Sequence, residues 1–217
     1  MSDIFNEVDE EVRREQLKKL WARWGNYIVA LGVLIVAAVG AWRGYEYYVT
    51  QKAARAGADF EAAVQLSEAG KRAEAETAFN KIAAEAPGGY RALARLRAAA
   101  ELAHREPKAA VAAYDALSAD ASLGIALQDL AGLRAAMLLV DTEPLTEIQR
   151  RLEVLAQPGR AFRHTAREIL ALSAWKANDR QAARRYLDMI TADGESPAGT
   201  RARAEVISAL IASAGSS

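Results

Sequence analysis

The hydrophobic and polar positions divide the chain into a short charged segment, one long apolar stretch and a large region with helical periodicity. The apolar stretch, residues 25–42, reads GNYIVALGVLIVAAVGAW and contains no Asp, Glu, Lys or Arg. A helix that crosses a bilayer needs about 20 mostly apolar residues. The pattern therefore predicts a single transmembrane helix over residues 25–44.

Residues suited to the bilayer surface mark both borders of this stretch. Tryptophan and tyrosine rings prefer the headgroup level, and an arginine can extend its charged end toward water. The predicted membrane-interface residues are Trp21, Trp24, Tyr27, Trp42 and Arg43.

Two other interpretations of the apolar stretch fit the residues less well. A cleaved signal peptide has a short apolar core followed by small residues, whereas 24 mostly polar residues precede this stretch and Trp-Arg-Gly-Tyr ends it. A buried helix of a soluble core would need apolar neighbours on every side, which a small alanine-rich helical protein supplies poorly. We therefore expect an uncleaved anchor.

Lysine and arginine residues predict the orientation of this anchor. Residues 1–24 carry five of them, and the comparable stretch after the span carries three: Arg43, Lys52 and Arg55. Because basic residues favour the cytoplasmic side, the N-terminus is predicted to be cytoplasmic, and everything after the span is predicted to lie across the membrane.

Residues 1–24 form the predicted cytoplasmic amphipathic segment. Apolar residues recur there at spacings of three to five, with acidic residues first and basic residues later, an order that suits the helix dipole. A solvated helix that leads into the span explains this pattern. The alternatives are an interfacial helix, or a contact for a membrane partner, through Trp21 and Trp24.

Beyond the anchor, apolar positions recur with the period of helices, and four 13-residue windows align with one another. The windows begin at Gly70, Arg105, Glu143 and Asn178, which are 35, 38 and 35 residues apart. Their sixth position is alanine in three windows, and their tenth position always holds a bulky residue. A small residue lets two helices approach closely, and a bulky one fills the space beside it. Each window is therefore predicted to be the second helix of a stacked pair.

An alanine- or leucine-rich segment precedes each window and supplies the first helix of the pair. The predicted fold is all-α: the transmembrane helix, then an α-solenoid of about four helix pairs over residues 45–214. Residues 200–214 form a capping helix, and 215–217 form a disordered tail. The predicted first helices cover residues 53–69, 90–104, 123–140 and 162–177.

The windows resemble the second helix of tetratricopeptide (TPR) repeats. Gly70, Ala75, Phe79 and Pro87 match that pattern. Later windows depart from it, most clearly at Ile148, where a small residue is usual, and the aromatic residues usual in first helices are missing. The recurring period therefore supports a TPR-like solenoid more strongly than any single window does.

The layout of the whole chain also resembles one family. A charged N-terminus that opens DIFNEVDEEVRREQLKKLW, one uncleaved span and a divergent TPR region look like the ancillary SecYEG translocon subunit family of bacterial inner-membrane proteins. The resemblance implies a single-pass bacterial inner-membrane protein with a periplasmic C-terminal domain. Its implied partners are Sec translocon subunits, periplasmic chaperones or unfolded client polypeptides. The alternative is a scaffold for another inner-membrane or cell-envelope assembly complex.

Composition and charge argue against several classes of function. Lys plus Arg and Asp plus Glu both number 28, so the formal net charge is zero, which argues against a nucleic-acid binder. There is no cysteine, and the two histidines, His104 and His164, lie 60 residues apart, so no cofactor or metal site is predicted. No constellation of catalytic residues appears either. The expected role is protein binding rather than catalysis, with the lipid bilayer as a further partner.

The first helices of a solenoid line its concave face, which is the usual binding surface. Met137 and Trp175 suit varied apolar partners, since thioethers and large aromatic rings fit irregular surfaces. The alternative is that the side chains on this face pack on one another. The predicted partner groove consists of Phe60, Val64, Arg95, Leu102, Leu130, Leu133, Met137, Leu172 and Trp175.

Eight arginines gather in the third and fourth windows and the segment between them. A solvated face paired with nearby acids, such as Glu147, Glu153 and Asp188, explains them. Contact with anionic lipid headgroups or with an acidic partner is the alternative. The arginines are Arg150, Arg151, Arg160, Arg163, Arg167, Arg180, Arg184 and Arg185.

Overall fold

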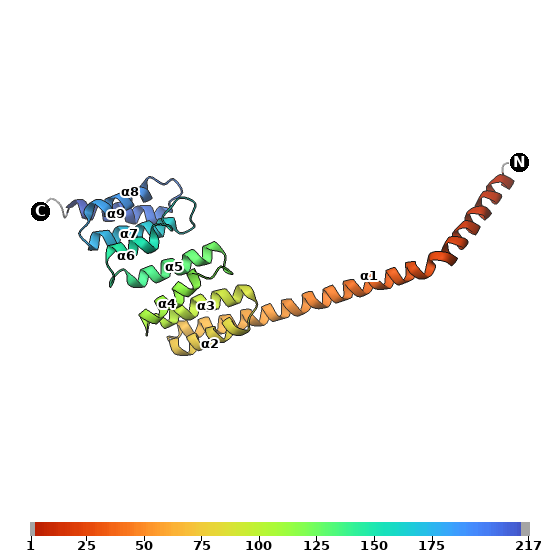
Figure 1. Ribbon diagram of the computed structural model, residues 1–217, viewed down its shortest axis with the longest axis horizontal. Coiled ribbons are helices and arrows are strands. Elements are labelled where there is room, and N and C mark those ends of the chain that lie inside the picture. Colours follow the sequence, from red (N-terminus) through yellow and green to blue (C-terminus); the bar gives the residue numbers. More distant parts are fainter. Residues whose placement is uncertain (1–2, 214–217) are drawn as a thin grey trace. The chain divides into compact units, whose positions relative to one another are not determined.

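The computed structural model describes residues 3–213, and within this range it contains nine α-helices and no β-strand (Figure 1). The all-α prediction is therefore confirmed for the described residues. The helices are α1 (Asp3–Glu68), α2 (Arg72–Glu85), α3 (Gly88–Leu102), α4 (Pro107–Ser118), α5 (Ile125–Leu139), α6 (Leu145–Leu152), α7 (Arg163–Lys176), α8 (Arg180–Thr191) and α9 (Ala198–Ser213).

The first helix is continuous through the predicted end of the anchor at residue 44. All five prolines of the chain lie beyond α1, and isolated glycines weaken a helix without ending it. The chain divides into two compact units between Ala54 and Arg55, inside α1. The predicted tail at 215–217 lies outside the described residues, as do most side chains of the amphipathic segment predicted at 1–24.

The second unit consists of the end of α1 and the eight shorter helices, which follow one another in chain order (Figure 1). The four windows become α2, α4, α6 and α8, and the segments before them become the end of α1, α3, α5 and α7. Helix α9 follows as the predicted closing element. The shortest helix is α6, with 8 residues, and it belongs to the window that departs most from the TPR pattern.

The turns within two of the helix pairs have the same backbone geometry. Gly70 and Asn178 both have a positive φ, of 77° and 60°. In each turn the next residue donates its N–H to a carbonyl five residues earlier, Lys71 to Leu66 and Asp179 to Ala174, at 2.9 Å. This is the Schellman end of a helix, where glycine is preferred and asparagine is tolerated. Gly70 and Asn178, the first residues of their windows, therefore form the turns that lead into α2 and α8.

The repeated positions of the four windows form the interior. The sixth position is fully buried in every window, including Ile148, and the bulky tenth position is at most 3% exposed. Phe79 illustrates the packing, because its ring meets the edge of Phe60 from α1 with centroids 5.3 Å apart. The core continues from pair to pair through three clusters, so each pair is stabilised by its neighbours.

The packing around Phe79 generates a test of the stacked core. Phe79→Ala leaves a cavity against Phe60, and we expect the free energy of unfolding to fall by roughly 3–5 kcal/mol. The measurement is urea unfolding of the detergent-solubilised chain, followed by circular dichroism. Phe79→Leu, which leaves a smaller cavity, is expected to lose less, and a loss below about 1 kcal/mol for Phe79→Ala would place this ring outside the core.

Candidate functional site

Three successive odd-numbered helices expose large apolar side chains, and in α5 these include Ile125 at the start of the helix. Leu93 of α3 is 43% exposed, Met137 of α5 is 48% exposed, and Leu172 of α7 is 37% exposed. Exposed apolar residues that recur on one side of a domain indicate an interaction surface. We call the side of α3, α5 and α7 that carries them the odd-helix face.

The orientation of α5 follows from Gly132. A Cβ added at Gly132 would lie 3.8 Å from Leu155, in the segment after α6, and 3.9 Å from Ser118 of α4. That side of α5 therefore points to the even-numbered helices. Arg134 and Met137 lie about half a turn away around the helix, so they point away from the even-numbered helices.

Helix α3 has the same two sides. Arg95 and Leu102 line a pocket of about 250 Å³ together with residues of α2 and α4, so they lie on the side of the even-numbered helices. Leu93 and Arg97 lie on the opposite side and are exposed. The odd-helix face of α3 therefore carries Leu93 and Arg97.

The nine residues of the predicted groove do not share one surface. Met137 and Leu172 lie exposed on the odd-helix face, and the half-buried Leu130 lies on the same side of α5. Arg95 and Leu102 lie on the opposite side of α3, where they line a separate pocket, so the prediction of one shared groove is wrong for them. Leu133 is 4% exposed in the core, so its predicted exposure to a partner is wrong.

The other three groove residues are partly buried against the core, as the packing alternative expected. Phe60 lies between Phe79 and Tyr90, with its ring centroid 5.3 and 5.9 Å from theirs. Val64 belongs to the same cluster, and Trp175 packs against the core around α7 and α8. These side chains stabilise the stack, and binding stays a prediction for Met137 and Leu172.

The sequence reasoning missed Leu93, Arg97 and Arg134. Burial raises the pKa of the Tyr114 hydroxyl, and the positive charges of Arg134 and Arg97 oppose that shift. A usable signal exists in α5, where Arg134 is the only basic residue of a largely apolar helix. A lone basic residue in such a helix indicates its solvent side.

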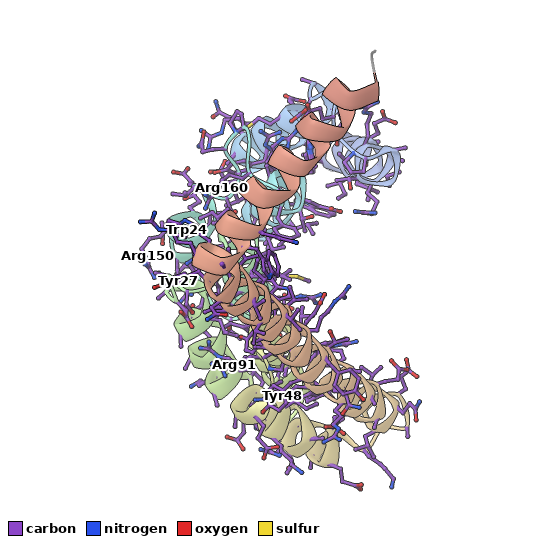
Figure 2. All side chains as sticks on the ribbon, turned by 90° about the vertical axis from the view of Figure 1, so that its right-hand side faces the viewer. Trp24, Tyr27, Tyr48, Arg91, Arg150 and Arg160 are labelled. Carbon is purple, nitrogen blue, oxygen red and sulfur yellow. The ribbon has the colours of Figure 1, made fainter. Side chains whose placement is uncertain are left out.

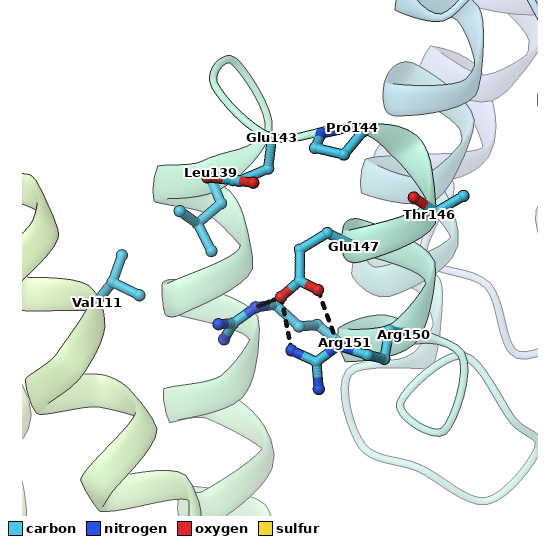
Figure 3. A pocket seen from close by; sticks show the side chains of 8 residues that line it. All are labelled: Val111, Leu139, Glu143, Pro144, Thr146, Glu147, Arg150 and Arg151. Carbon is cyan, nitrogen blue, oxygen red and sulfur yellow. Dashed lines mark hydrogen bonds and ion pairs between the residues drawn. The ribbon is translucent and has the colours of Figure 1, made fainter.

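Five of the eight arginines are paired with acids inside the domain. Glu147 of α6 accepts two hydrogen bonds from Arg150, at 2.8 and 2.6 Å, and one from Arg151 at 2.8 Å (Figure 3). Arg151 also donates to Asp115 of α4 at 2.6 Å. The two guanidinium groups, Arg150 first, lower the pKa of Glu147 to about 2. This network joins α4 to α6 and borders a pocket of about 540 Å³ that also contains Val111.

A second group of pairs centres on Asp193, between α8 and α9. Arg163 and Arg167 of α7 each donate to this carboxylate at 2.9 Å, and chiefly the Arg163 hydrogen bond holds the pKa of Asp193 far below its ordinary value. Arg160 similarly donates to Asp129 of α5 at 2.5 Å.

The predicted pairing therefore holds for these five arginines. Apart from Glu147, their partners are Asp115, Asp129, Asp193 and Glu195, and not Glu153 or Asp188, which the sequence also suggests. The remaining three arginines, Arg180, Arg184 and Arg185, are exposed on α8.

In the described part of the chain, no group of three or more His, Cys, Asp or Glu side chains is arranged to hold a metal ion. His104 is exposed. His164 is 8% exposed, neither of its ring nitrogens has a hydrogen-bond partner, and Nδ1 lies 3.8 Å from the Asp193 carboxylate. Burial, followed by the charge of Arg163, lowers the pKa of His164.

One helix of the described residues is long and apolar enough to cross a membrane, judged by length and composition. Only 6% of its apolar window is buried, at a mean hydropathy of 1.9, which argues against a core helix. The predicted interface aromatics are exposed, from 54% at Trp24 to 71% at Trp42, and Arg43 is exposed as well. Trp24, Tyr27 and Tyr48 are labelled along α1 in Figure 2.

Comparison with known families agrees with this architecture. A family model described as "Tetratricopeptide repeat-like domain" matches residues 18–185. The chain belongs to this TPR-like family. No curated protein and no solved structure matches the chain, and the narrower resemblance to ancillary SecYEG subunits is not confirmed. TPR-like domains are typically non-catalytic modules for protein–protein interaction, so the family indicates a binding role for the TPR-like domain.

The buried His164 predicts a pH dependence of the stability of the TPR-like domain. The folded domain disfavours protonation of this ring, whereas the unfolded chain binds the proton near the ordinary pKa of about 6.5. His164 therefore leaves the free energy of unfolding at its full value above that pH. As the pH falls below it, the free energy of unfolding decreases by at most about 1.4 kcal/mol per pH unit.

The measurement is urea unfolding at a series of pH values. His164→Gln is expected to reduce the decrease in the free energy of unfolding between about pH 7.5 and pH 5. His104→Gln, which changes an exposed histidine, is the matched control. An unchanged decline in the His164→Gln variant would contradict this assignment.

Proposed function

We propose that this chain is a membrane-anchored protein-interaction module. In this proposal α1 crosses the bilayer, and the TPR-like domain binds a partner polypeptide on the odd-helix face. The observation that carries the proposal is the set of exposed apolar residues on three successive odd-numbered helices, Leu93, Met137 and Leu172, in a domain of a protein-binding family. Each side chain offers apolar area that a partner can remove from water.

The anchor is supported by the uncovered apolar window of α1 and by the exposed aromatic residues at its borders. The arginine and lysine distribution favours a cytoplasmic N-terminus. We therefore place the TPR-like domain in the periplasm of a bacterium, held at the inner membrane. Tethering raises the effective concentration of the domain at the membrane, so weak contacts can suffice for binding.

The narrower form of the proposal names the partners. We propose an ancillary subunit of the Sec translocon that links translocation to periplasmic chaperones. It is supported by the layout of the whole chain, with a charged start, one span and a divergent TPR region. Chaperones and emerging polypeptides expose apolar segments, and these suit a face with large exposed apolar side chains on α3, α5 and α7.

The test changes the odd-helix face without disturbing the core. The double variant Met137→Asp, Leu172→Asp places a charge at two exposed positions. We expect partner recovery to fall by roughly tenfold or more while the melting temperature stays nearly unchanged. Trp175 is left intact because it packs against the core. The measurement is crosslinking in native membranes, followed by quantitative identification of Sec subunits and periplasmic chaperones.

The matched control is Val154→Asp, which places a charge on a 61% exposed residue outside the odd-helix face. It is expected to leave recovery unchanged. Equal recovery from the double variant and the unaltered chain would show that another surface binds the partner. Recovery of a different envelope complex, lost in the double variant, would contradict the Sec assignment and support the interaction module.

A further inference from the structure

One strip of α8 concentrates positive charge that the domain leaves unpaired. Arg180, Arg184 and Arg185 line a shallow hollow of about 980 Å³ along this helix. None of the three forms an ion pair with a carboxylate of the described residues, in contrast to the five paired arginines before them. The hollow contains a single acid, Asp188, so its lining carries an excess of positive charge.

Arg185 is held in place by the core beneath it. Its guanidinium lies over the ring of Tyr186, 4.8 Å from the centroid, and donates to the Tyr186 hydroxyl at 3.1 Å. Tyr186 is itself 3% exposed and also accepts a hydrogen bond from Gln149 of α6 at 3.3 Å. An arginine that is already positioned loses less side-chain entropy when it binds an anion.

Beside these charged residues and Gln181, the hollow has an apolar part. Met189 and Ala192 lie on the same strip, and Met189 is partly buried against the core. Its thioether can adapt to apolar side chains of different shape. The hollow therefore combines cations with an apolar area on one strip of the helix.

We propose that this α8 hollow is a second binding site, for an acidic polypeptide segment that also carries apolar side chains. Carboxylates of the segment pair with Arg180, Arg184 and Arg185, and an apolar side chain rests on Met189 and Ala192. A segment of chain can enter a hollow that a flat bilayer surface would leave unfilled. Because α8 is an even-numbered helix, this site is separate from the odd-helix face and does not depend on the function proposed for it.

The test uses the full chain in nanodiscs of neutral phosphatidylcholine. The probe is a fluorescent peptide of alternating glutamate and leucine, and its binding is measured by anisotropy at low and high salt. We expect Arg180→Glu with Arg184→Glu to weaken binding by about tenfold or more at low salt, and salt to weaken binding to the unaltered chain. Both side chains are exposed, so melting is expected to be unchanged. Arg180→Gln with Arg184→Gln is a milder second variant, with an intermediate loss.

The control for charge is Lys81→Glu with Lys108→Glu, which makes the same charge change at exposed positions of α2 and α4. It is expected to leave binding unchanged. Equal binding of a glutamine–leucine peptide, or full binding by both arginine variants, overturns the proposal. So does arginine-dependent binding to phosphatidylglycerol vesicles without binding of the acidic peptide, since the hollow would then contact lipid.

Discussion

The whole arrangement depends on one apolar segment that the rest of the protein does not cover. Residues 25–42 carry no charged side chain, and 6% of the apolar window of α1 is buried. Removing apolar surface from water is worth about 25 cal/mol per Å², so a helix that exposes its full circumference requires another apolar environment. Aromatic side chains at both ends, Trp24 and Trp42 among them, suit the level where a bilayer meets water. In the function proposed here, this helix holds the binding domain at a membrane surface.

In the TPR-like domain, the packing of helix pairs decides which surfaces stay free. Alanine at the sixth position and a bulky residue at the tenth bury the even-numbered helices against the odd ones, as Ala75 and Phe79 do. Ion pairs between helices, such as Arg151 with Asp115, add links on the side of the even-numbered helices. The odd-helix face receives neither kind of contact at Met137 and Leu172, and its apolar side chains remain available. The α8 hollow is free for another reason, because its arginines exceed the acids within their reach.

The helices and turns can be predicted from local residues, whereas the side of each helix that stays exposed cannot. Gly70 and Asn178 identify two turns, since each adopts the left-handed backbone that ends a helix. Period and residue size similarly locate all four second helices. The alanine-rich segment of α3, however, offers two possible stripes, and the stripe predicted from the sequence contains Arg95, whereas Leu93 is the exposed apolar residue. Asp115, Asp129 and Asp193, which pair with Arg151, Arg160 and Arg163, lie 30 or more residues away from them in sequence. Such contacts come from tertiary packing, which spacing along one chain does not encode.

Membrane attachment and orientation are tested most directly by protease access in sealed membrane vesicles, combined with alkaline extraction. An antibody to the C-terminal domain would follow the chain. We predict that the chain stays in the membrane pellet after alkaline washing. In inside-out vesicles the domain should survive external protease until detergent opens them, while the N-terminal segment is removed. Release of the chain into the supernatant, or digestion of the domain in intact inside-out vesicles, would contradict the account.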